Sequence, residues 1–119
     1  MARTRKEQTT NRERDGSATL GPAPIVFEMI GGKWKLLILQ VLIFQGTHRF
    51  GALRRKIEGI TQTMLTARLK ELERDGLVSR RVYAEVPPRV EYAATDAGRD
   101  LETVFRSMHD WWLRNRDHR

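Results

Sequence analysis

The residues best suited to covalent chemistry lie late in the sequence. Ser107, His109 and Asp110 have the side-chain types of a nucleophile, a base and an orienting acid. Such a relay requires mutual hydrogen bonds, but on a helix, at about 100° per residue, positions 107 and 109 point about 200° apart. The three side chains therefore cannot form a relay, and we predict that the protein is not an enzyme.

Metal and phosphate chemistry are also disfavoured by spacing. The sequence has no cysteine, and its histidines lack the spacing of metal ligands: His48, His109 and His118. Gly31-Gly32-Lys33 resembles the end of a phosphate-binding loop, but Phe27 and Trp34 stand where that motif needs Gly and Ser or Thr. We predict no metal and no cofactor.

The charge points to a polyanionic partner. The sequence carries a formal net charge of +7 and has a pI near 10.5, which is typical of nucleic-acid binding, although a membrane-surface protein would have the same sign. Most of the excess lies between positions 49 and 89. This range contains ten basic residues and five acidic ones. The basic residues are Arg49, Arg54, Arg55, Lys56, Arg68, Lys70, Arg74, Arg80, Arg81 and Arg89.

Insertion into a membrane is not expected. The longest apolar run, residues 36–44, falls well short of the roughly 18 residues that a span needs. The first residues are polar and lack the apolar segment of a signal peptide. With no cysteine to form disulfides, we expect a cytoplasmic protein.

The sequence predicts a tail followed by one folded domain. Residues 1–20 are too polar to offset their ordering entropy by burial, so we predict a disordered basic tail before a domain at 21–116. Hydrophobic periodicity, Gly, Pro and capping residues then predict helices, a hairpin and a last helix. The predicted helices are 24–30, 33–45, 50–57, 61–75 and 96–115, and the strands are 77–83 and 90–94.

The helix predicted at 61–75 has the clearest pattern. Thr61 is a candidate N-cap and Gly76 a C-terminal stop. One stripe is apolar, made by Leu65, Leu69 and Leu72, and the opposite face carries Thr63, Thr66, Ala67, Lys70 and Arg74. Together with the short helix before it and the hairpin after it, this layout is that of a winged helix-turn-helix. In that fold the second helix enters the DNA major groove, where small polar side chains such as Gln62, Thr63 and Thr66 can read base edges.

Several motifs resemble the HxlR family of bacterial regulators over residues 22–113. They are Ile-Gly-Gly-Lys-Trp-Lys at 30–35, Arg-Phe-Gly-Ala-Leu-Arg-Arg at 49–55, Gly-Ile-Thr-Gln-Thr-Met-Leu-Thr at 59–66, Leu-Glu-Arg-Asp-Gly-Leu-Val at 72–78, Val-Pro-Pro-Arg-Val-Glu-Tyr at 86–92 and the Trp pair at 111–112. The resemblance implies a homodimeric winged-helix repressor or activator on a palindromic operator, dimerised through its first and last helices. It also implies DNA contacts from Arg49, the 61–70 helix and a wing carrying Arg89.

One departure from the family concerns sensing. Many members carry a Cys-Pro pair before the first helix, and that Cys senses reactive molecules, whereas this sequence has Ala23-Pro24. Any effector of this chain is therefore expected to bind noncovalently, or to act through a slower chemistry such as methionine oxidation.

These observations give one DNA hypothesis, in which base reading and phosphate binding fall to different side chains. Gln62, Thr63 and Thr66 read bases of double-stranded DNA. The phosphates are held by Arg49, Arg54, Lys70, Arg80 and Arg89.

The last helix holds more apolar surface than a small monomer easily covers, which leaves three interpretations open: internal core, a homodimer seam, or part of a ligand pocket. The seam would use Leu101, Val104, Phe105, Met108, Trp111 and Trp112, and the pocket for a small-molecule effector would use Phe27, Trp34, Trp111 and Trp112.

Two other functions fit a winged helix. A protein-interaction module would present an acidic or apolar face on its second helix. Here that face favours DNA, because it carries Thr63, Thr66, Lys70 and Arg74. A single-stranded RNA reader would need an aromatic stacking platform, which we do not find.

Overall fold

The computed structural model describes residues 21–118, and the boundary between the two units of the chain falls between Gly31 and Gly32. In the first unit the described part forms helix α2 (Ala23–Ile30), with Pro24 in its first turn, where the missing N–H breaks no helical hydrogen bond. The tail predicted at 1–20 lies outside the described residues. All other elements belong to the second unit.

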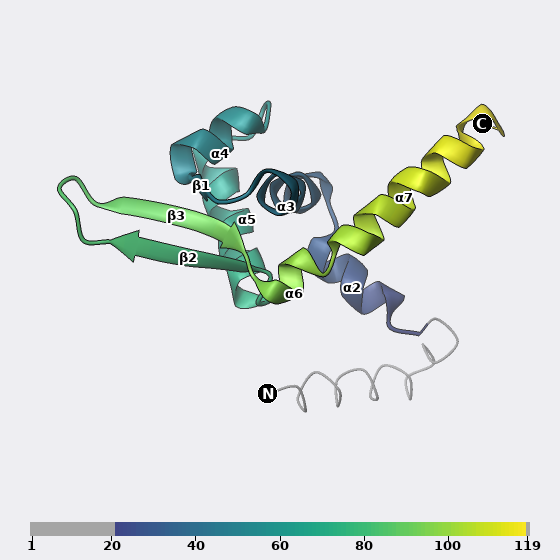
Figure 1. Ribbon diagram of the computed structural model, residues 1–119, viewed down its shortest axis with the longest axis horizontal. Coiled ribbons are helices and arrows are strands. Elements are labelled where there is room, and N and C mark those ends of the chain that lie inside the picture. Colours follow the sequence, from purple (N-terminus) through teal and green to yellow (C-terminus); the bar gives the residue numbers. More distant parts are fainter. Residues whose placement is uncertain (1–20, 119) are drawn as a thin grey trace. The chain divides into compact units, whose positions relative to one another are not determined.

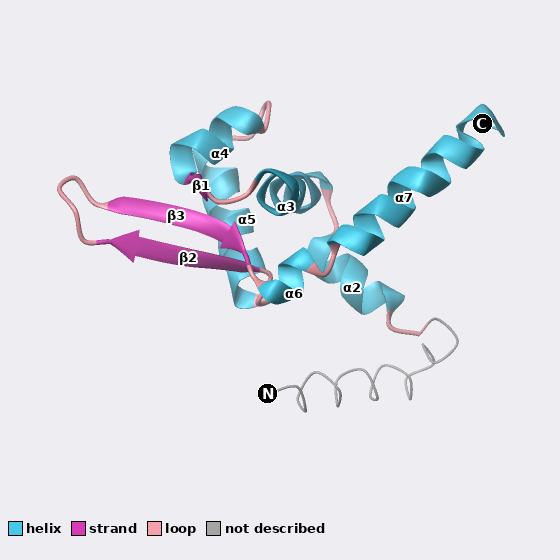
Figure 2. Ribbon diagram, in the orientation of Figure 1, coloured by secondary structure: helices cyan, strands magenta, loops and turns pink. Residues whose placement is uncertain are grey.

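The second unit is mainly helical, with one small sheet (Figures 1 and 2). Its helices are α3 (Lys33–Gln45), α4 (Phe50–Lys56), α5 (Gln62–Arg74), α6 (Asp96–Arg99) and α7 (Glu102–Asn115), followed by a short 3₁₀ turn at Arg116–His118. Its strands are β1 (His48–Arg49), β2 (Val78–Tyr83) and β3 (Arg89–Ala94). None of the helices within 21–118 is long and apolar enough to span a membrane.

The core of this unit is built around α3, because that helix is apolar on nearly every side. It buries Ile38, Leu39, Val41 and Leu42. Around it, α4, the turn that follows α4, α5 and the residues that lead into the hairpin contribute branched aliphatic side chains. These are Leu53, Ile57, Ile60, Leu65, Leu69, Leu72, Leu77 and Val78. Burying each such side chain contributes about 1.5–3 kcal/mol, so the contacts of α3 fix the positions of α4 and α5.

The sheet has the order β1-β3-β2, and both pairings are antiparallel. β2 and β3 form the predicted hairpin, which reaches from Val78 paired with Ala94 to Tyr83 paired with Arg89. The short strand β1 was not predicted. It pairs with β3 through His48–Tyr92 and Arg49–Glu91, which attaches the segment before α4 to the hairpin.

The single last helix predicted from position 96 is wrong, because the chain forms two helices there. Thr95 caps the first, since its Oγ1 accepts a hydrogen bond from the backbone N–H of Gly98 (3.1 Å). Leu101 then has ψ near −8°, away from the helical value, and its N–H donates to Gly98 O (3.0 Å), three residues back. This tight turn separates α6 from α7.

Candidate nucleic-acid interface

Helices α4 and α5 are joined by a turn that the core holds in place. Ile57 and Ile60 are buried at its two ends, and Gly59 between them has φ +87°, a conformation that favours glycine. Thr61 then caps α5, because its Oγ1 accepts a hydrogen bond from the backbone N–H of Met64 (3.1 Å). The start of α5 therefore has a defined direction relative to α4.

Helix α5 has a buried and an exposed side, as its sequence predicts. Leu65, Leu69 and Leu72 are at most 1% exposed. The candidate base-reading and phosphate residues lie outward and are all exposed: Gln62, Thr63, Thr66 and Lys70. The buried stripe prevents the helix from rotating about its axis, so the same polar side chains always face outward.

The middle of α5 is also attached to α3 by charge. Glu71 lies 3.2 Å from the Nε of Arg68 and 3.6 Å from the Nζ of Lys35 on α3. Arg68 is therefore engaged within the chain, although it belongs to the basic residues counted in this region. Lys70 makes no ion pair among the described residues and projects from the outward face.

The amino end of α5 has the electrostatics of an anion site. A helix amino terminus carries unpaired N–H groups and partial positive charge. The first turn of α5 contains no acidic residue that would neutralise it, and Gln62 and Thr63 in that turn are exposed. This end suits the approach of a DNA phosphate.

The pairing of the strands assigns the arginines of the sheet to different faces. Arg49 and Arg81 both lie opposite Glu91 and share one face, whereas Arg80 lies opposite Tyr92 on the other face. Residues two apart on a strand share a face, so Arg89 lies with Arg81. The structure therefore does not bring the predicted phosphate ligands Arg80 and Arg89 together.

Arg89 is the predicted DNA residue whose surroundings differ most from expectation. Its Nη2 lies 3.2 Å from a Glu85 carboxylate oxygen and its Nε lies 3.6 Å from Glu91. Its guanidinium carbon lies 3.9 Å from the centre of the Tyr83 ring. The side chain is only 26% exposed, whereas Arg49, Arg54 and Arg80 are exposed.

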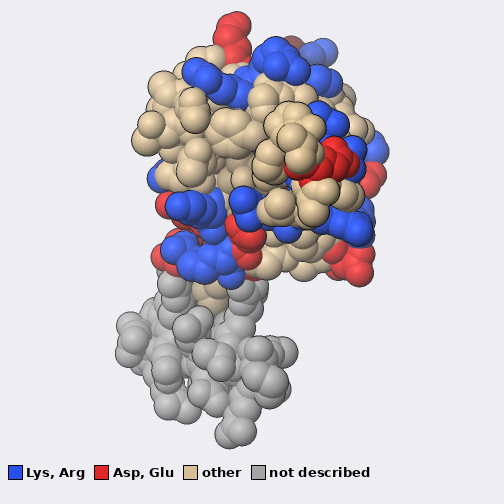
Figure 3. Space-filling view, turned by 90° about the vertical axis from the view of Figure 1, so that its left-hand side faces the viewer, with Lys and Arg blue, Asp and Glu red and all other residues tan. Residues whose placement is uncertain are grey.

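Positive charge is spread over the surface around these elements. On the face drawn in Figure 3, Lys and Arg side chains border an uncharged area, with smaller groups of Asp and Glu among them. On α4, Arg54 and Arg55 are exposed, whereas Lys56 donates a hydrogen bond to Gln45 Oε1. The sequence hypothesis omitted Arg55 and Arg81, and the period-two alternation of β2 could have separated Arg80 from Arg81.

The predicted dimer residues, Leu101 just before α7 and the others on α7, do not all lie at the surface. Val104, Met108, Trp111 and Trp112 are 40–58% exposed, and Leu101 is half-buried. Phe105 departs from this pattern because it is 5% exposed and belongs to the core. It leaves almost no surface for a second copy of the chain, so the exposed stripe of α7 consists of the other residues.

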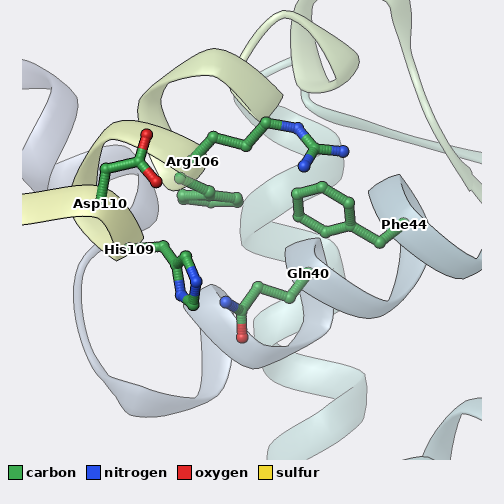
Figure 4. A pocket seen from close by; sticks show the side chains of 6 residues that line it. Gln40, Phe44, Arg106, His109 and Asp110 are labelled. Atoms are coloured by element: carbon green, nitrogen blue, oxygen red, sulfur yellow. The ribbon is translucent and has the colours of Figure 1, made fainter. Parts of the chain in front are cut away.

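A pocket of about 380 Å³ lies between α3 and α7 (Figure 4). Arg106 lies over the ring of Phe44, with 5.2 Å from its guanidinium carbon to the ring centre, and donates a hydrogen bond to Glu102 (2.8 Å). The lining residues are Gln40, Phe44, Phe105, Arg106, His109 and Asp110. None of them belongs to the effector pocket predicted from the sequence. Ser107 is absent from this lining, so it does not meet His109 and Asp110 there.

Known proteins resemble this chain in sequence and in structure. The family model for the HxlR-like helix-turn-helix matches residues 29–119. The HTH-type transcriptional regulator YdeP of Bacillus subtilis is 48% identical over 96 residues, covering 81% of this chain and 74% of that protein. The redox regulator HypR in its reduced form is 46% identical with a TM-score of 0.74, covering 82% of this chain and 95% of that one.

A second solved structure is also similar to this chain in sequence and in fold. The reduced form of the transcriptional regulator YodB from B. subtilis is 39% identical with a TM-score of 0.69, covering 75% of this chain and 86% of that one. These proteins are named as regulators rather than enzymes, and their likeness confirms the predicted winged helix-turn-helix, with the β2–β3 hairpin as the wing. The chain belongs to the HxlR-like helix-turn-helix family of transcriptional regulators.

Proposed function

We propose that this regulator binds a specific operator in double-stranded DNA as a homodimer and represses transcription by occupying it. Helix α5 enters the major groove, with Gln62, Thr63 and Thr66 at base edges. The exposed cations around it hold the phosphates on either side. They are Arg49, Arg54, Lys70 and Arg80.

One observation carries most of this proposal: the division of α5 into a buried aliphatic stripe and an exposed polar face. A groove-reading helix must be held firmly on one side, because base contacts require side chains placed to within a fraction of an ångström. Leu65, Leu69 and Leu72 are buried completely or nearly so, and Thr61 fixes the first turn. The residues left outside are short and uncharged at the amino end, and Lys70 follows them.

Affinity would come mainly from phosphate contacts. Each phosphate neutralised releases condensed counterions, so binding weakens steeply with salt. The amino end of α5 adds its N–H groups to this attraction, since no acidic side chain lies in its first turn. Base contacts from Gln62, Thr63 and Thr66 would add specificity to an affinity that is largely electrostatic.

The exposed stripe of α7 supports the homodimer. Val104, Met108, Trp111 and Trp112 lie on one side of the helix at three- and four-residue steps. A two-fold dimer joined here would present two copies of α5, which reach half-sites about 34 Å apart on a palindromic operator.

An effector of this chain would bind noncovalently, because the sequence holds no cysteine for thiol chemistry. The pocket between α3 and α7 supports this idea. Its aromatic walls, Phe44 and Phe105, lie beside hydrogen-bonding groups of Gln40 and His109.

The proposal is tested by footprinting on genomic fragments, starting with the DNA upstream of the regulator's own gene. We expect two protected half-sites related by two-fold symmetry. Changing Gln62 to Ala should then relax the preference at one base pair in each half-site, typically by about 1–3 kcal/mol. The matched control is Arg114→Ala, an exposed change on α7. Uniform protection with no preferred site, or an unchanged preference in the Gln62 variant, would contradict the assignment.

A further inference from the structure

The wing tip contains a guanidinium group enclosed by the wing's own side chains. Arg89 stands at the start of β3, directly opposite Tyr83 at the end of β2. Three side chains surround its guanidinium: two carboxylates, from Glu85 and Glu91, and the ring of Tyr83. We refer to these four residues as the wing clamp.

We propose that Arg89 is a positioning residue of the wing, which holds the hairpin tip in its DNA-binding orientation and does not itself bind a phosphate. This inference rests on the proposed function. Within it, Arg89 orients the wing, whereas the exposed arginines bind phosphates. It makes the carboxylates Glu85 and Glu91 contributors to DNA binding, although both are negatively charged.

The geometry of the clamp ties three parts of the hairpin together. Glu85 belongs to the loop, Glu91 to β3 and Tyr83 to β2, and the Arg89 guanidinium contacts all three. The planar fork of an arginine can engage two carboxylates and stack on a ring at the same time, which a lysine ammonium cannot do. Arg81 lies over the same ring, 5.0 Å from its centre, so Tyr83 receives a guanidinium from each strand.

The charges around Arg89 argue against its acting as a phosphate ligand. Two carboxylates already lie beside its single positive charge, and Arg89 and Glu91 are each only 26% exposed. A phosphate reaching this guanidinium would have to displace a carboxylate or lie beside it, and either arrangement costs electrostatic energy. Arg80 on the opposite face is exposed and makes no ion pair among the described residues, so it meets a phosphate without this cost.

The clamp also decides what the tip presents. The loop between the strands includes Val86, Pro87 and Pro88, and Val86 is 101% exposed. Prolines restrict the backbone of this loop, and the Glu85–Arg89 ion pair closes it across its base. The result is a stiff, uncharged tip between the arginines of β2 and β3, which DNA can meet without ordering a flexible loop.

The test uses the sign of a charge change. Glu85→Gln removes a negative charge near the DNA, so electrostatics alone predicts tighter binding. The clamp predicts the reverse, roughly three- to tenfold weaker binding to the operator, because the tip loses its restraint. The control is Glu73→Gln, an exposed carboxylate on α5 outside the clamp, which should bind more tightly. Tighter binding by both variants would overturn the proposal.

Variants at Arg89 give a second, independent measurement. With Arg89→Gln, the slope of log affinity against log salt should stay unchanged while affinity falls, because no phosphate contact is lost. Arg89→Lys keeps the charge but should bind as weakly as Arg89→Gln. A slope reduced by about 0.9, or full rescue by Lys, would identify Arg89 as a direct phosphate ligand instead.

Failure of this inference can be distinguished from failure of the proposed function. The NMR signal of the Arg89 Nε–H in the unbound chain reports the clamp without DNA. It should shift in Glu85→Gln and Glu91→Gln and stay unchanged in Glu73→Gln. A signal indifferent to all three changes would overturn the clamp. Absence of any preferred DNA site for the unaltered chain would instead refute the proposed function.

Discussion

A Cβ atom on Gly98 would lie 2.2 Å from the carbonyl oxygen of Leu77, so the start of α6 packs directly on the backbone that follows α5. Two hydrogen bonds accompany this approach. Thr95 donates its backbone N–H to Leu77 O (3.1 Å) and its hydroxyl to Gly76 O (2.6 Å). The start of α6 is therefore fixed to the segment that directly follows α5, the helix proposed to enter the DNA groove.

Replacing Gly98 with Ala should lower the free energy of unfolding by about 2–4 kcal/mol, because backbone must move to admit the methyl group. Chemical denaturation measures the loss. Gly51→Ala in α4 is the matched control, since its Cβ would lie 3.5 Å from the nearest atom, on Arg55, and helix propensity favours Ala there. Equal stability of the two variants would contradict the close approach.

Replacing Thr61 with Ala should cost about 1 kcal/mol of stability, since the backbone N–H of Met64 loses its partner. Thermal denaturation compares it with Thr63→Ala, which removes an exposed hydroxyl with no capping role and should stay within about 0.5 kcal/mol of the unaltered chain. A Thr63 variant as unstable as the Thr61 variant would argue against the cap.

Replacing Lys70 with Ala should weaken binding to every DNA sequence alike, because a phosphate contact carries no sequence information. The slope of log affinity against log salt should fall by about 0.9. Arg114→Ala on α7 removes the same charge away from α5 and should leave the slope unchanged. A loss confined to one base pair would mean that Lys70 reads a base instead.

Replacing Met108 with Glu should shift the chain from dimer to monomer, because a charge buried in an apolar seam is strongly unfavourable. Sedimentation equilibrium measures the change in association. Thr103→Glu adds the same charge on another side of α7 and should leave the dimer intact. If Met108→Glu associates as the unaltered chain does, the seam lies elsewhere.

The parts of the fold that local chemistry determines could be predicted from the sequence. Helix α5 has its limits where Thr61 caps it and Gly76 follows it, and its buried side is the stripe of leucines. These signals lie within the helix or next to it, so the sequence predicts them without knowledge of distant contacts.

The parts of the fold that depend on distant partners could not be predicted from the sequence. Strand β1 is two residues long and exists because His48 and Arg49 pair with β3, far along the chain. The break between α6 and α7 has no Gly or Pro at Asp100–Leu101 to mark it, and the apolar steps continue across it. In the candidate site, the sequence pattern does not reveal that Glu85 and Glu91 converge on Arg89, because the folded hairpin brings these side chains together, and the assignment of Arg89 to a phosphate stays a prediction.

The most direct test of the central claim is a salt-titrated competition between the regulator's own upstream DNA and a scrambled fragment of equal length. A sequence-specific regulator should prefer the upstream fragment over the scrambled one by at least about 10³-fold at physiological salt. The affinity for each fragment should fall as salt rises. Equal, weak binding to both fragments that vanishes with salt would leave only a basic surface, and would contradict the account.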